Sequence, residues 1–105
     1  MKVSRTLHNH KRDWDDLGLL DPLWAIAAVG KTQYGEWSLE DFLVSGDQEI
    51  DRVIADLCRL SLSVNYGTCL DFGCGIGRVS QVLSKHFQTC YGVDISEIMI
   101  AKANE

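Results

Sequence analysis

The residues of this chain that are best suited to chemistry are an acid and three glycines between positions 70 and 77. The glycines, Gly73, Gly75 and Gly77, stand at alternate positions, and Asp71 comes two residues before the first of them. Glycine lacks a Cβ, so its backbone can take a positive φ and lie against a ligand while nearby N–H groups face that ligand. This spacing points to a loop that binds a nucleoside ligand.

The elements around this loop are expected to be a strand and a helix. Residues 68–72 are compatible with a strand, and the apolar residues after the glycines have helical spacing. A second strand is predicted at 89–93 and is followed by Asp94, which lies 21 residues after Gly73. A carboxylate at the end of this strand can accept hydrogen bonds from both hydroxyls of a ribose.

A further helix is predicted after the second strand, with Ser96 as its N-cap. Strands that alternate with helices in this way are typical of α/β proteins with a parallel sheet. We therefore predict a Rossmann-like, doubly wound parallel sheet, of which about two strands are present, with an N-terminal helical extension.

The glycine spacing separates two classes of nucleoside cofactor. Dinucleotide-binding loops read G-x-G-x-x-G, whereas here the third glycine comes one residue earlier and an acid precedes the first. The sequence resembles the class I S-adenosylmethionine-dependent methyltransferases, whose first motif is an acid followed by G-x-G-x-G and whose second strand ends in an acid. Met99 and Ala101 also occupy positions that this family often fills with Met and Ala.

The resemblance implies S-adenosylmethionine as the cofactor. The glycines would let the loop pass under its methionine portion, Asp71 would hold the loop and the ammonium group, Asp94 would bind the ribose, and Ile95 would pack on the adenine. None of the residues with these implied roles is a catalytic base, so the catalytic residues stay unassigned. No metal site is expected. The implied cofactor-binding residues are Asp71, Gly73, Cys74, Gly75, Gly77, Asp94 and Ile95.

Two alternatives from other classes remain open. An NAD(P)-dependent oxidoreductase also has a glycine turn and a ribose-binding acid, although Asp71 and the glycine spacing disfavour it. The other alternative is a non-catalytic, truncated methyltransferase-like partner protein. In either case Arg78, which follows the loop, is expected to be a solvated or packing residue.

The length of 105 residues is short for a doubly wound sheet, which has five or more strands. The last predicted helix runs to Glu105 without a glycine or proline to end it. We therefore expect residues 67–105 to be the truncated start of the cofactor domain and the isolated fragment to be inactive. Exposed sheet edges would then permit self-association.

Residues 1–66 are expected to form a helical segment that packs on the sheet. One helix is predicted to start at Asp21 and stop at Gly30, and a second is predicted to start at Ser38 and end near Gly46. Asp47 is then expected to cap a third helix, whose apolar stripe should lie on the sheet. That stripe consists of Ile50, Val53, Ile54, Leu57 and Cys58.

Several aromatic and imidazole side chains precede the glycine loop. Helices before the first strand often cover the cofactor in the resembled family, so an aromatic lid is one alternative. The spacing of Trp14, Trp24, Tyr34 and Trp37 shows no single helical face, so we expect Trp24 in the core and the others anchoring loops. His8-Asn9-His10 lies in a polar N-terminus that we interpret as mobile, and its two histidines receive no role.

The composition of the chain limits the kinds of molecule that are expected to be its methyl acceptor. The net charge of −5 and the pI near 5.0 give no basic footprint for nucleic acid, so a small molecule is favoured as methyl acceptor. The longest apolar run, residues 23–29, is too short to cross a membrane. The four cysteines contain no C-x-x-C pair, which favours reduced thiols and a cytoplasmic location.

Overall fold

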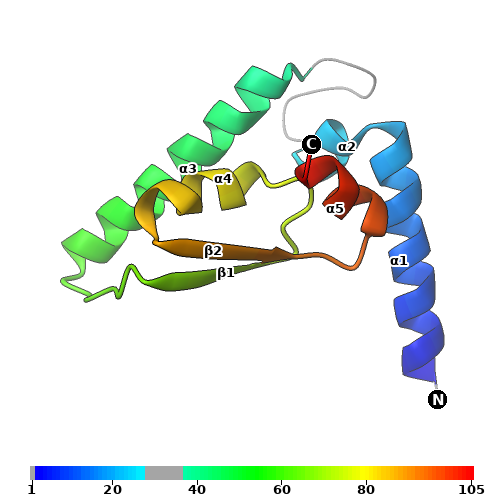
Figure 1. Ribbon diagram of the computed structural model, residues 1–105, viewed down its shortest axis with the longest axis horizontal. Helices are drawn as coiled ribbons and strands as arrows, with labels where there is room; N and C mark the ends of the chain where they lie inside the picture. The colour runs from blue at the N-terminus through cyan, green and yellow to red at the C-terminus, as the bar shows by residue number, and fades with distance from the viewer. Residues whose placement is uncertain (1, 28–36) are drawn as a thin grey trace.

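The computed structural model describes residues 2–27 and 37–105, with side chains from residue 6 onward. Within these ranges the chain forms helices on one side of a short sheet, with a further helix beside the sheet's end (Figure 1). In chain order the elements are α1 (Lys2–Leu20), α2 (Pro22–Ile26), α3 (Leu39–Arg59), β1 (Thr68–Phe72), α4 (Arg78–His86), β2 (Thr89–Val93) and α5 (Glu97–Ala103).

The two strands pair in parallel, in a register that places Thr68 opposite Thr89 and Phe72 opposite Val93. Both strands have the predicted bounds, and α4 forms the crossover between them. The expectation of a partial Rossmann-like α/β fold is therefore confirmed.

The two faces of the sheet differ in their cover. Helix α4 lies on one face and α3 packs against the outer side of α4, so that these elements form three layers (Figure 1). Buried residues between the two helices include Phe42, Ile50 and Val82. Among the described residues nothing covers the opposite face, where Leu70 is 60% and Phe72 is 86% exposed.

Helix α3 is one continuous helix, whereas we predicted two helices that meet at Gly46. Ser38 is the N-cap, as expected, and its hydroxyl accepts a hydrogen bond from the Asp41 N–H at 3.0 Å. Gly46 is buried inside this helix. The position requires glycine because a Cβ there would lie 2.4 Å from the backbone oxygen of Arg78. Asp47 accepts a hydrogen bond from Lys85 of α4 at 2.9 Å instead of capping a new helix. This glycine thus permits close helix packing and does not end the helix.

The apolar stripe of α3 lies against α4 and not, as we expected, on the strands. Ile50 is 7% exposed, whereas Val53, one turn later, is 47% exposed. Helix α4 occupies the sheet face, and α3 forms the outer layer (Figure 1). The division of the chain at residue 66 stays a prediction.

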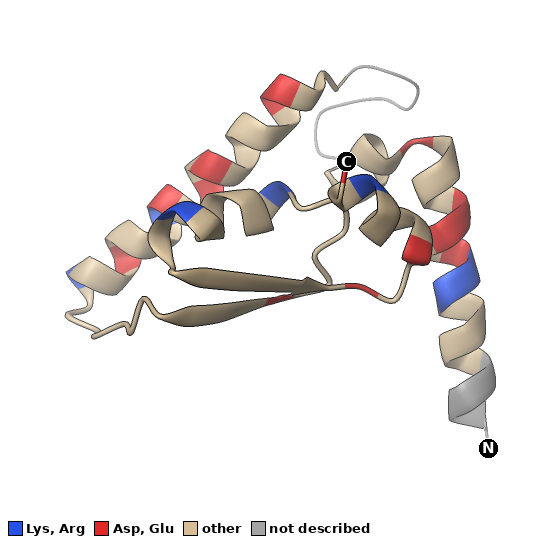
Figure 2. Cartoon of the chain, viewed as in Figure 1, with Lys and Arg blue, Asp and Glu red and all other residues tan. Residues whose placement is uncertain are grey.

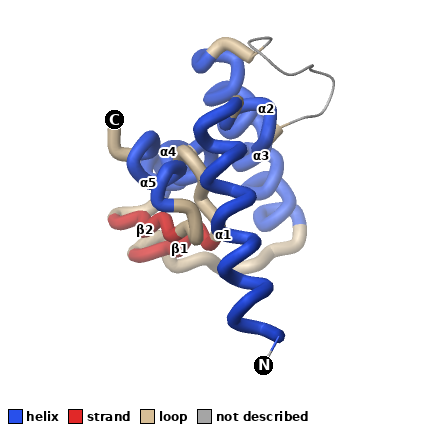
Figure 3. The backbone as a smooth tube through the Cα atoms, turned by 90° about the vertical axis from the view of Figure 1, so that its right-hand side faces the viewer, coloured by secondary structure: helices blue, strands red, loops and turns tan. Residues whose placement is uncertain are grey.

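The N-terminal region contains a helix that the sequence interpretation missed. The N-terminus around residues 8–10 was expected to be mobile, yet α1 begins at Lys2 and packs against α5, as the view in Figure 3 shows. Helix α2 starts as predicted, with the Asp21 carboxylate accepting from the Trp24 N–H at 3.2 Å, but it ends at Ile26. The predicted stop at Gly30 lies outside the described residues.

Charged residues are spread over the helices (Figure 2). Acidic residues lie along α3 and in the middle of α1, and the basic ones of the described residues are interspersed among them (Figure 2). None of the helices in the described part of the chain combines the length and apolarity needed to cross a lipid bilayer.

Candidate functional site

The glycine loop leaves the end of β1 and is tied to the end of β2. The carbonyl oxygen of Val93 accepts hydrogen bonds from the Gly73 N–H at 2.7 Å and from the Cys74 N–H at 2.9 Å. Gly73, Gly75 and Gly77 have φ values of 80°, 54° and 90°, which lie in the left-handed region. A side chain would be strained at each of these positions, so the three glycines are needed for this path of the backbone.

Asp94 joins the loop to the start of α5. Its Oδ2 accepts a hydrogen bond from the Gly75 N–H at 2.8 Å, and its Oδ1 accepts one from the Ser96 N–H at 2.9 Å. A carboxylate offers about four acceptor positions, so about two stay free for a ligand. Asp94 therefore shapes the loop and also retains the capacity to bind hydroxyl groups.

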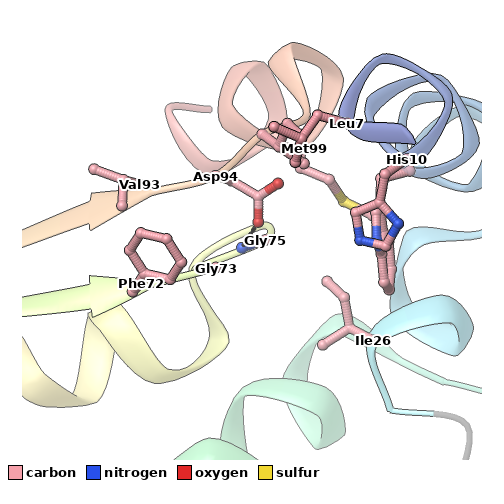
Figure 4. Close-up of a pocket in the computed structure, with 11 residues that line it drawn as sticks. Leu7, His10, Ile26, Phe72, Gly73, Gly75, Val93, Asp94 and Met99 are labelled. Atoms are coloured by element: carbon pink, nitrogen blue, oxygen red, sulfur yellow. Dashed lines mark hydrogen bonds between the residues drawn. The ribbon is translucent and has the colours of Figure 1, made fainter. Parts of the chain in front are cut away.

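A cavity of about 700 Å³ opens beside the loop, a volume within the range of small-molecule sites. Figure 4 shows Asp94 and Gly75 on one side of this cavity and His10 on the other. Its lining residues are Leu7, His10, Trp14, Ile26, Phe72, Gly73, Gly75, Val93, Asp94, Ile95 and Met99.

Helix α1 provides one wall of the cavity. Leu7, His10 and Trp14 are spaced by three and four residues, which places them on one helical face. The indole Nε1–H of Trp14 donates to Nε2 of His10 at 3.3 Å, and the two rings meet edge to face at 81°. We name this surface, Leu7, His10 and Trp14, the α1 wall.

The α1 wall is held in place by contacts with α5. Oδ1 of Asp15 accepts hydrogen bonds from the Ser96 hydroxyl at 2.5 Å and from the Ile98 N–H at 3.4 Å. Lys11 donates to the other oxygen of Asp15 at 2.7 Å. The hydrogen bond from Lys11, followed by that from Ser96, lowers the pKa of Asp15 to about 2. Asp15 is therefore ionised at neutral pH and holds the first turn of α5 against α1.

The structure brings four of the seven implied site residues to the cavity. Gly73, Gly75, Asp94 and Ile95 line it. The other three are not among the lining residues: Asp71 accepts from the Ser80 hydroxyl at 2.6 Å, Cys74 is 8% exposed, and Gly77 is the N-cap of α4. Asp71 thus fixes the loop to α4 and does not face the cavity.

The thiols next to the loop are poor nucleophiles. Burial, followed by the neighbouring Cys69 thiol, raises the pKa of Cys90 to about 11. Burial also raises the pKa of Cys74, and the carboxylates of Asp71 and Asp94 add to this effect. Because the reactive species of cysteine is the thiolate, Cys74 and Cys90 are protonated and unreactive at neutral pH.

Sequence interpretation disfavoured the α1 wall: an aromatic lid that included Trp14 was one alternative, but we preferred a loop-anchoring role. Trp14 was expected to anchor a loop and His10 was given no role, but both line the cavity. The spacing of Leu7, His10 and Trp14 was the available signal, because it is the spacing of one helical face. Trp37 does anchor a loop, since its indole N–H donates to the Ala27 carbonyl oxygen at 2.7 Å. Tyr34 lies outside the described residues.

The part of the chain that contains the glycine loop and both strands is similar to a known protein family. Residues 69–105 match the family described as "Methyltransferase domain". This segment is therefore similar to methyltransferase domains. The match contains the glycine loop, α4, β2, Asp94 and α5, which are the elements on one side of the cavity.

The chain is also similar to a curated enzyme, a 23S rRNA (uracil(1939)-C(5))-methyltransferase of Marinomonas sp. (strain MWYL1). The two are 25% identical over 118 aligned positions, which cover 98% of this chain. The chain spans 27% of the length of that relative. No solved structure matches the chain. The comparisons thus show that the segment is methyltransferase-like, and they identify neither its cofactor nor its methyl acceptor.

Proposed function

We propose that the chain binds S-adenosylmethionine in the cavity beside the glycine loop and takes part in the transfer of its methyl group to a small acceptor molecule. The observation that carries the proposal is the loop of three left-handed glycines, tied to the end of β2 and bordered by Asp94. The match of residues 69–105 to a methyltransferase domain supports it.

The residues of the cavity suit this cofactor in shape and in hydrogen-bonding capacity. A Cβ at Gly73 would meet no atom within 4 Å, so the backbone there is open to close approach by a ligand. The free acceptor positions of Asp94 match a pair of ribose hydroxyls. Ile95, which is 38% exposed and lines the cavity, offers a flat apolar contact for a base.

The chemistry that the cofactor supplies is an activated methyl group on a sulfonium, which an acceptor lone pair attacks while the C–S bond breaks. The protein's contribution is then to orient the two reactants and to exclude water. Of the described residues around the cavity, Phe72, Val93 and Met99 offer apolar side chains that the reactants could contact.

We propose a small molecule as acceptor, although the curated relative is named for an RNA substrate. The chain carries 15 acidic and 10 basic residues, and RNA binding depends on basic side chains that neutralise phosphates. Acidic side chains on α1 and α3 would repel a phosphate backbone (Figure 2). A uracil-rich ribooligonucleotide is therefore expected not to bind.

Calorimetric titration with S-adenosylmethionine and S-adenosylhomocysteine tests the proposal. Both should bind saturably to the chain, and Asp94→Asn should weaken binding because an amide cannot accept from two N–H groups on its two sides. Asp51→Asn, an exposed change on α3, is the matched control and should bind as the parent chain does. A folded chain that binds neither ligand would refute the proposal, and tight binding of the ribooligonucleotide would refute the choice of acceptor.

A further inference from the structure

The α1 wall presents its polar atoms as a linked pair. Of the described residues on this wall, His10 and Trp14 carry side-chain nitrogens, and these two are bonded to each other. Leu7 on the same wall and Ile26 of α2 are apolar. A ligand that reaches this wall therefore meets one imidazole edge within an apolar surface.

The hydrogen bond from Trp14 assigns the tautomer of His10. An indole nitrogen only donates, so Nε2 of His10 must accept and carries no proton while this bond is made. The proton of the neutral imidazole is then on Nδ1. His10 thus offers an N–H donor, and accepting a proton from a substrate would require it to lose its bond with Trp14.

The opposite wall restricts the charge of the ligand. Asp94 is the one formally charged side chain among the described lining residues. Lys11, next to His10 in sequence, is paired with Asp15 at 2.7 Å and is not among the lining residues. An anionic acceptor would be repelled by Asp94, and the described lining residues include no Lys or Arg to offset this repulsion, whereas an uncharged acceptor would not be repelled.

Resting on the proposed methyltransferase function, we propose that His10 binds the methyl acceptor by donating a hydrogen bond from Nδ1 to an oxygen of an uncharged small molecule. The apolar part of that molecule contacts Leu7 and Trp14. His10 is a binding residue in this account and takes no proton during the reaction. Trp14 has two tasks, since it fixes the imidazole tautomer and contacts the acceptor.

A matched pair of probes tests the oxygen contact. Acetophenone and α-methylstyrene have nearly the same shape, but only the first has a carbonyl oxygen. We expect the chain saturated with S-adenosylhomocysteine to bind acetophenone about three- to tenfold more tightly, as measured by NMR titration, which is the preference that one hydrogen bond supplies. Benzoate, which is anionic, should bind more weakly than acetophenone.

Three variants assign the preference to His10. His10→Phe should abolish the preference for acetophenone because it keeps an aromatic ring and removes the donor. His10→Gln should restore part of it through the amide N–H. His8→Phe is the matched control, since His8 lies on the same helix, is exposed and does not line the cavity, and it should leave the preference unchanged.

The outcomes separate this inference from the proposed function. If S-adenosylhomocysteine binds but the two probes bind equally, or acetophenone does not bind, the assignment of His10 is overturned and the cofactor site stands. If His10→Phe retains the preference, the assignment is likewise overturned. If S-adenosylhomocysteine fails to bind to the folded chain, the proposed function falls and this inference falls with it.

Discussion

Replacement of Gly46 by alanine is expected to destabilise the protein even though alanine is the better helix former. The new Cβ would lie 2.4 Å from the backbone oxygen of Arg78 and 3.1 Å from its carbonyl carbon. These are backbone atoms of α4 and cannot rotate away. Helices α3 and α4 must therefore separate, which would also weaken the bonds from Arg78 to Ser45 and Glu49.

The magnitude follows from two opposing terms. Alanine in a helix interior gains about 1 kcal/mol over glycine, whereas overpacking a closely packed contact costs about 1–3 kcal/mol. The lost hydrogen bond to Ser45 adds to the cost. We expect a net loss of about 1–2 kcal/mol, which with a urea m-value of about 2 kcal/mol/M lowers the denaturation midpoint by about 0.5–1 M.

The same substitution at Gly18 of α1 provides the matched control. A Cβ there would lie 3.1 Å from Cγ2 of Ile98, a side-chain atom that can move by a few tenths of an ångström. Gly18→Ala should therefore keep most of the helix-propensity gain and leave the protein unchanged or more stable by up to about 1 kcal/mol. Urea denaturation followed by circular dichroism compares the two variants.

A Gly46→Ala protein as stable as Gly18→Ala would refute this reasoning. The two glycine variants should also differ in ligand binding, because Arg78 directly follows Gly77 of the loop. Displacement of the Arg78 carbonyl should disturb the loop, so Gly46→Ala should weaken binding of S-adenosylhomocysteine. Gly18→Ala should leave that binding intact.

Three further results are expected. Because the pKa of Asp15 is lowered from 3.8 to about 2, the contribution of its carboxylate to the docking of α1 is present above pH 3.8 and is lost as the pH falls toward 2. Trp14 fluorescence should report this loss, and Asp15→Asn should remove the transition. Gly73→Ala should weaken binding of S-adenosylhomocysteine about 5- to 30-fold, since a φ of 80° costs an alanine about 1–2 kcal/mol, and unchanged calorimetric affinity would contradict this. Cys90, with a pKa of about 11, should resist iodoacetamide at pH 8 when the modified cysteines are located by peptide mass spectrometry, whereas rapid alkylation of Cys90 itself in the folded protein would show that this thiol is more reactive than its pKa indicates.

The segment from β1 to α5 is the part of the structure that the sequence predicted best. Both strands and the Ser96 cap follow from local signals, as does the Asp21 cap in the N-terminal region, since strand periodicity and capping side chains act within a few residues of themselves. The glycine loop was predicted for the same reason, because a left-handed φ at alternate residues requires glycine.

The errors concern contacts between elements that are distant in sequence. Gly46 indicates a helix end when only its neighbours are considered, and the reason for it lies 32 residues away in the Arg78 carbonyl. The docking of α1 likewise depends on a distant partner, since Asp15 accepts from the Ser96 hydroxyl, 81 residues later. Neither contact leaves a local pattern in the sequence.

Ser96 connects the two walls of the candidate site. Its N–H donates to Asp94, which holds the glycine loop, and its hydroxyl donates to Asp15, which holds α1. The same hydroxyl accepts from the Met99 N–H at 3.2 Å, and the residue is fully buried. Since a shift of Ser96 would move both carboxylates, the glycine loop and the α1 wall cannot be positioned independently. The distance between Asp94 and His10 across the cavity is therefore set by the first turn of α5, an element that lies within the methyltransferase-like segment itself.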